Sequence, residues 1–114
     1  MAFFSKPDPK PERPQPPRVR RIVDRVIYDT AKAECIASHV KRRTSAGLAF
    51  YSQEVLYRST QGNWFLVLGQ RYHLDQQPDV FVQPLSAEQV FAWLAEYNEI
   101  DLLERHFPGR TQYA

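Results

Sequence analysis

Cysteine and histidine are the residue types in this sequence that come closest to forming a reactive pair. The chain has one cysteine, Cys35, and His39 follows it four residues later. A thiol nucleophile needs a base within hydrogen-bond reach. On a helix the two side chains would be neighbours, whereas on a strand they share one face about 13 Å apart. Because the sequence positions no third group beside them, we expect Cys35 to be a buried, unreactive structural thiol.

The remaining reactive residues form no recognisable catalytic, metal or cofactor site. His73 and His106 are isolated in the sequence, so the spacing of a zinc site is missing and both are expected on the surface. The four glycines lie too far apart to build a loop around a phosphate group. The sequence therefore predicts a protein that is not an enzyme and that needs neither a cofactor nor a metal.

Basic residues form a second group of candidates, in this case for contacts with nucleic acid. Residues 22–73 carry seven basic and four acidic side chains, but residues 74–114 carry two basic and seven acidic ones. Residues 22–114 taken together are net acidic, which is atypical of a nucleic-acid-binding domain. Direct nucleic-acid binding is therefore the alternative hypothesis. Its candidate contacts are Lys41, Arg42, Arg43, Arg58 and Arg71.

The acidic C-terminal part is a third candidate surface. A predicted apolar helix stripe occupies the inward positions there, so four acidic side chains are expected to point outward. If the protein occupies the nucleic-acid groove of a partner, this face can mimic the charge of phosphates. The four residues are Glu88, Glu96, Glu99 and Asp101.

Proline dominates the N-terminal segment. Six of the nine prolines lie between Lys6 and Arg18, and proline fixes φ and has no amide hydrogen to donate. An extended, polyproline-II-like arm is expected over residues 1–21. Two roles stay open for this basic arm: a solvated spacer, or a peptide that docks onto a partner. The candidate contacts in the arm are Phe3, Phe4, Arg13, Arg18, Arg20 and Arg21.

Alternating apolar residues predict the strands that follow the arm. One strand is expected from Arg21 to Tyr28. Residues 31–43 are ambiguous: their apolar spacing slightly favours a helix, but they can also pair as a strand. The clearest element is a hairpin between Glu54–Thr60 and Trp64–Leu68, with Gly62 at positive φ in its loop. The second strand of this hairpin is apolar on both faces, so it is expected to be central and buried. A further short strand is expected at residues 80–82.

Helical signals dominate the C-terminal third. Ser86 and Gln89 form a capping box, and an apolar stripe at helical spacing follows them. Asn98 is expected to cap a second short helix, with Ile100, Leu103 and Phe107 facing inward. The predicted fold is α+β: a four- or five-stranded, mainly antiparallel sheet with two C-terminal helices on one face, formed by a single domain at residues 22–110 and followed by a tail at 111–114.

Four short motifs carry a resemblance to known proteins. They are Tyr28-Asp29-Thr30, Leu56-Tyr57-Arg58-Ser59-Thr60, Gly62-Asn63-Trp64-Phe65-Leu66 and Pro84-Leu85-Ser86. In their order they resemble small accessory proteins encoded by phages, plasmids and integrative elements. The resemblance favours a strand at residues 31–43. It implies a partner-binding accessory protein and transfers no catalytic or binding residues.

Together these observations lead to one functional expectation. We expect a non-enzymatic mobile-element protein that acts by protein–protein binding, for example an inhibitor of a host defence complex of the anti-CRISPR or anti-restriction type. The alternative is a nucleic-acid-binding accessory protein that uses the basic arm and residues 41–43. No signal peptide or apolar run of membrane-spanning length is expected, and a single cysteine fits the cytoplasm.

Overall fold

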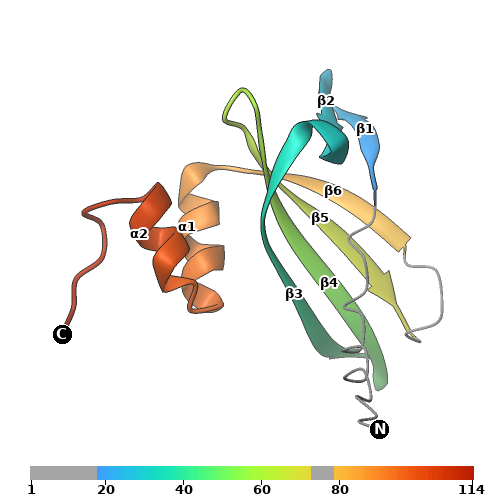
Figure 1. The fold of residues 1–114 in the computed structure, drawn as a ribbon. Helices are drawn as coiled ribbons and strands as arrows, with labels where there is room; N and C mark the ends of the chain where they lie inside the picture. The colour runs from blue at the N-terminus through green and yellow to red at the C-terminus, as the bar shows by residue number, and fades with distance from the viewer. Residues whose placement is uncertain (1–17, 73–78) are drawn as a thin grey trace, which may run out of the picture.

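A four-stranded antiparallel sheet organises the chain. The computed structural model describes residues 18–72 and 79–114. The sheet has the order β3-β4-β5-β6, so each strand lies beside its neighbour in sequence (Figure 1). The strands are β3 (Ala33–Ser45), β4 (Leu48–Ser59), β5 (Trp64–Arg71) and β6 (Asp79–Leu85). The predicted α+β class is therefore confirmed.

The central strands β4 and β5 form the hairpin that the sequence predicted. Arg58 lies opposite Trp64 in the register, and the strands are joined by a short loop. The amide of Gly62 donates to the carbonyl of Ser59 at 2.9 Å, and Gly62 has a φ of 85°. A residue with a side chain is strained at this φ, whereas glycine is not. Both strands extend further than expected, because pairing continues to Tyr51 and Arg71.

Within the ambiguous residues 31–43, residues 33–43 belong to an edge strand, not to an α-helix. A single 3-10 turn, η1 (Thr30–Lys32), is capped by the side chain of Asp29 and leads directly into β3. The helical spacing of apolar residues was misleading because β3 contains a bulge between Cys35 and Ala37. A bulge inserts one residue and changes which face the following side chains occupy, which disturbs the period-2 pattern of a regular strand.

The segment expected to be one strand at residues 21–28 is a two-stranded hairpin. It consists of β1 (Arg20–Val23) and β2 (Val26–Asp29), which pair with each other in a separate sheet. Asp24 and Arg25 form the turn with φ values of 48° and 67°. A type I′ turn requires positive φ at both positions and usually contains Asn or Gly. Asp-Arg lacks that signal, so the turn was missed.

Two helices follow the sheet. The first, α1 (Ala87–Glu96), begins with the predicted capping box of Ser86 and Gln89. The second, α2 (Ile100–His106), has no side-chain cap: Asn98 adopts a φ of 54° in the connection instead of capping it. Leu103 is buried as expected, but Ile100 is 56% exposed, so the inward position predicted for it is wrong. Neither helix has the length and apolar character needed to cross a membrane.

The sheet is covered on both faces. On one face α1 and α2 pack over Leu56, Trp64 and Leu66. On the other face the β1–β2 hairpin packs over a second apolar cluster. The members of this second cluster are Val19, Tyr28, Val55, Tyr57, Phe65 and Val67. The fold is therefore a central sheet between a helical layer and a small hairpin.

The β3–β4 turn provides a test of the backbone geometry. Ala46 and Gly47 join these strands with φ values of 51° and 79°. Asn tolerates the left-handed region much better than Ala does, and β-branched residues tolerate it least. We expect Ala46→Asn to raise the free energy of unfolding by about 0.5 kcal/mol, and Ala46→Val to lower it by about 1 kcal/mol. Urea unfolding curves of both variants would measure this, and equal stabilities would contradict the assigned turn.

Candidate binding surface

A network of hydrogen-bonded and ion-paired side chains, here called the polar seam, connects β3 and β4 to the helical layer. Glu54 is its centre, and its other members are His39, Lys41, Arg43, Trp93, Glu96, Tyr97 and Glu99. The Glu54 side chain on β4 is nearly buried, yet it accepts three hydrogen bonds. The donors are the indole of Trp93 at 3.2 Å, the phenol of Tyr97, and the guanidinium of Arg43 at 3.0 Å. A buried carboxylate is costly unless it is paired and hydrogen-bonded in this way.

His39 and Lys41 extend the seam along β3. The Nε2 atom of His39 lies 2.7 Å from a carboxylate oxygen of Glu99, and its ring stacks on Tyr97 with centroids 4.0 Å apart. The Nζ atom of Lys41 lies 2.5 Å from a carboxylate oxygen of Glu96 and 4.6 Å from the centre of the Tyr97 ring. The hydrogen bond and charge of Lys41 lower the pKa of Glu96.

The seam is best interpreted as the contact that docks α1 onto the sheet. Within the described part of the chain, every buried polar side-chain atom has a hydrogen-bond partner. Burial, together with the neighbouring Glu54 carboxylate, raises the pKa of Tyr97 and keeps its phenol a hydrogen-bond donor. A set of side chains that satisfy one another leaves little bonding capacity for a substrate or ligand.

The basic cluster at residues 41–43 is divided by the strand. Successive side chains on a strand point to opposite faces, so Lys41 and Arg43 face the helical layer and pair with acids, whereas Arg42 lies on the other face. Arg58 lies over the ring of Trp64 with its central carbon 4.8 Å from the centroid, and Arg71 is the last residue of β5. The five residues therefore do not form one basic patch.

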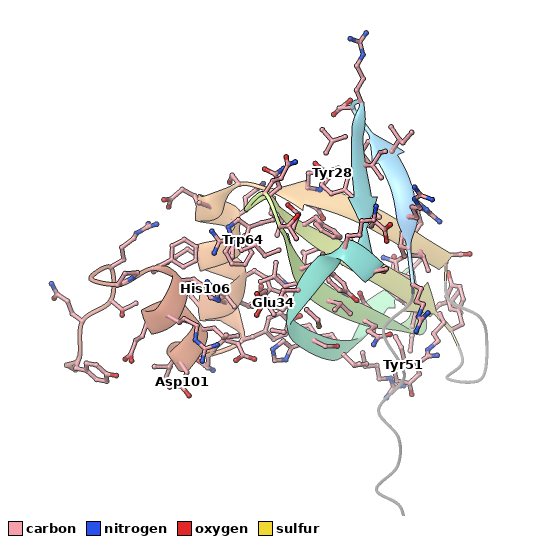
Figure 2. The ribbon with its side chains drawn as sticks, turned by 45° about the horizontal axis from the view of Figure 1, so that its top comes forward. Tyr28, Glu34, Tyr51, Trp64, Asp101 and His106 are labelled. Carbon is pink, nitrogen blue, oxygen red and sulfur yellow. The ribbon has the colours of Figure 1, made fainter. Side chains whose placement is uncertain are left out.

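The predicted acidic face is also divided. Glu88 and Glu96 are exposed, but each pairs with a basic residue: Arg110 for the first and Lys41 for the second. Glu99 turns toward the sheet to meet His39 and is only partly exposed, so its predicted outward orientation is wrong. Asp101 is exposed at the helical end (Figure 2). Among these four, it alone forms no ion pair with the residues that the structure describes.

The arm ends earlier than expected. Phe3, Phe4 and Arg13 lie outside the described residues, and Arg18 is exposed. Arg20 and Arg21 belong to β1. Arg20 pairs with Asp29 at 3.6 Å, and the guanidinium of Arg21 donates to the carbonyl of Val80 at 2.6 Å. These two arginines are therefore part of the folded hairpin rather than of the arm.

Cys35 is exposed, so its predicted burial is wrong. It lies opposite Tyr57 on the face that the hairpin covers, whereas His39, beyond the bulge, lies on the helical face. The bulge thus separates the two side chains that a regular strand would place on one face. His106, expected on the surface, is partly buried against Trp64 (Figure 2). Its burial lowers its pKa most, and the positive charges of Arg58 and Arg105 lower it further.

A groove beside the hairpin is the best candidate for a binding site. Its volume is about 450 Å³, and it lies between the four residues of β2 and the loop at residues 59–63. Tyr28 and Phe65 contribute aromatic rings that pack edge to face, with centroids 5.1 Å apart. The cationic side chains that line the groove are Arg20, Arg25 and Lys32. Figure 2 shows Tyr28 between the hairpin and the sheet.

The outer face of the hairpin adjoins this groove. Ile22 and Ile27 are cross-strand partners, and they are 70% and 59% exposed. They lie on the outer face because Tyr28 and Val23, their neighbours in sequence, pack against the sheet. Single exposed apolar residues are common on protein surfaces, but here two isoleucines lie side by side on a projecting ribbon.

Sequence reasoning missed this surface. Arg25 and Lys32 were not candidates, because isolated basic residues in turns give no signal of their own. Ile22 and Ile27 were placed on opposite faces of a single strand, since the turn between them was not recognised. The β-branched runs on either side of Asp24-Arg25 are visible in the sequence, but the pair itself is not a usual type I′ turn sequence, so it did not reveal the hairpin.

Comparisons with known proteins add no further assignment. The chain matches no protein-family model, no curated protein and no solved structure. In residues 18–72 and 79–114, no three His, Cys, Asp or Glu side chains come together as a metal site.

The seam predicts a pH-dependent effect of Tyr97. Because the folded state raises its pKa, Tyr97 stabilises the fold below about pH 10, where the unfolded tyrosine keeps its proton, and this stabilisation is lost as the pH rises further. We expect Tyr97→Phe to lower the free energy of unfolding by about 1 kcal/mol at pH 7, and by less at pH 11. Urea unfolding at both pH values measures this. A Tyr113→Phe control, at an exposed site, should leave stability unchanged at pH 7, and a constant loss for Tyr97→Phe at both pH values would contradict the prediction.

Exposure of Cys35 predicts reaction without unfolding. Burial of part of the side chain raises the pKa of the thiol, so the reactive thiolate is scarce at neutral pH. We expect iodoacetamide to modify the native protein, with a rate that rises on the order of a hundredfold from pH 7 to pH 9. Mass spectrometry would follow the adduct, with Cys35→Ser as the unlabelled control. Labelling that requires denaturant would show that the thiol is protected after all.

Proposed function

We propose that this protein is a non-enzymatic binding protein of a mobile genetic element, which acts by contact with another protein. An inhibitor of a host defence complex, of the anti-CRISPR or anti-restriction type, is the concrete form of this proposal. The observation that carries the binding role is the exposed cross-strand pair of Ile22 and Ile27. The mobile-element setting comes from the sequence resemblance alone.

The isoleucine pair has the composition of an interface centre. Apolar side chains gain about 25 cal/mol for each Å² that a partner removes from water. The pair is bordered by exposed basic side chains, including Arg20, whose side chain is 72% exposed, and Arg25. An apolar centre with a charged rim is the usual anatomy of a protein–protein interface, and the rim here favours an acidic partner surface.

The proline-rich arm supports the same location. Residues 6–18 contain six prolines and join the hairpin directly at Val19, which is buried beneath it. A partner bound to the hairpin is therefore close to the point where the arm begins. Arm and hairpin can then contribute to one continuous contact, and prolines, which fix φ before binding, lower the entropy that a segment loses on binding.

The alternative function is less well supported by the geometry. A nucleic-acid site at residues 41–43 would use Lys41 and Arg43, but both pair with carboxylates of this chain. Breaking the pair of Arg43 with Glu54 would leave a nearly buried carboxylate with one donor fewer. The protein-binding proposal requires no such rearrangement.

A variant of the hairpin tests the proposal. We expect Ile22→Ser/Ile27→Ser to keep the fold, because both side chains are exposed, and to abolish capture of the partner from the native host cell. Ile100→Ser is the matched control: it removes an isoleucine of similar exposure from α2, on the opposite layer. Quantitative mass spectrometry of tagged wild type, double variant and control measures the captured protein.

Two results would contradict the proposal. One is a captured protein that the double variant retains at the wild-type level. The other is capture that disappears after nuclease treatment, which would indicate that nucleic acid connects the two proteins and would favour the alternative function.

A further inference from the structure

The strand β2 has an open edge along the groove. Its other edge pairs with β1, and in the described part of the chain no further strand joins this small sheet. The groove is lined by all four residues from Val26 to Asp29 on this side. An unpaired strand edge presents backbone donors and acceptors that can accept another strand.

The register shows which backbone groups point into the open space. The amide of Thr30 donates to the carbonyl of Val19 at 3.0 Å. Bonded and non-bonded pairs alternate along an antiparallel ladder, so the pairs Arg20–Asp29 and Ile22–Ile27 are non-bonded. The backbone N–H and C=O groups of Ile27 therefore point away from β1, toward the edge that borders the groove.

The charge of the groove is positive. Arg20, Arg25 and Lys32 line it and are exposed, whereas Asp29 is the single acid among the described residues of its lining. The Asp29 side chain is 15% exposed; it already pairs with Arg20 and accepts the amide of Ala31 at 2.9 Å. The described lining of the groove therefore carries a net positive charge, because its three cationic side chains outnumber its one carboxylate.

We propose that this groove receives an extended, acidic segment of the partner protein, which adds as a strand to the open edge of β2. The inference rests on the proposed protein-binding function and names the kind of segment that is recognised. Main-chain hydrogen bonds to Ile27 set the register of the added strand relative to β2, as in other cases of strand addition. Alternate acidic side chains of the segment meet the arginines and the lysine.

The backbone chemistry favours a peptide over a nucleic acid. The edge at Ile27 offers a donor and an acceptor close together. A polypeptide supplies both complementary groups, whereas a phosphodiester supplies acceptors alone and would leave the carbonyl without a partner. The apolar side chains of Val26 and Tyr28, which lie on the same face of β2 in the lining, also suit a peptide with apolar residues at alternate positions.

A synthetic peptide tests the inference without the natural partner. The probe is an eight-residue, end-blocked, fluorescein-labelled peptide of alternating valine and glutamate, titrated into the full-length protein and followed by fluorescence anisotropy. We expect Lys32→Glu to weaken binding about tenfold, or about 1.4 kcal/mol. Arg42→Glu is the matched control, because it makes the same charge reversal on an exposed residue that does not line the groove.

Hydrogen exchange provides the readout that is specific to strand addition. The amide of Ile27 should become protected when the unlabelled peptide binds, whereas that of Tyr28, already bonded to β1, should change little. Binding without protection at Ile27 would overturn the inference. So would equal affinity for a valine-lysine peptide, tighter binding of an eight-nucleotide oligothymidylate, or no peptide binding at all.

The outcome is separable from that of the proposed function. The peptide titration needs no host protein, and the capture experiment needs no peptide. A partner that is lost on mutation of Ile22 and Ile27, combined with a failed peptide titration, would keep the protein-binding role and reject only strand addition.

Discussion

The burial of β4 and β5 on both faces is the constraint on which the rest of the structure depends. Val55 and Leu56 are fully buried although they point to opposite sides of the sheet, and Phe65 and Leu66 repeat this arrangement on β5. A sheet with two apolar faces must be covered twice. The two helices cover one face and the β1–β2 hairpin covers the other, so each end of the chain supplies one layer.

The hairpin layer has a consequence for function. A two-stranded ribbon is marginal by itself, and this one is held because Tyr28 and Val19 pack into the sheet. Its inner face is thereby used for folding, but among residues 18–72 and 79–114 its outer face packs against no apolar cluster and the free edge of β2 pairs with no strand. The exposed isoleucine pair and the open edge of β2 both arise from this arrangement, and Ile27 belongs to both and lines the groove.

The charged residues are distributed according to the same layers. On the helical side, Glu54 binds Trp93, Tyr97 and Arg43, so charge there serves to fasten α1 onto the sheet. On the hairpin side, Arg25 and Lys32 are exposed at the groove. A basic or acidic run in the sequence therefore says little about binding, because the fold decides which charges are neutralised internally and which remain available.

The sequence by itself determined the elements whose signals are local. The β4–β5 hairpin follows from two apolar runs around Gly62, and α1 follows from the Ser86–Gln89 capping box and its apolar stripe, because turns and caps are made by residues within a few positions of each other. Only the tertiary structure decided residues 31–43, which are a strand because β4 offers twelve partners to pair with, and the fate of Cys35 and His39, which a bulge places on opposite faces. The binding surface was equally beyond local reasoning: the turn at Asp24-Arg25 adopts positive φ without the usual residues, since packing of the hairpin against the sheet stabilises a backbone that the turn sequence alone does not favour.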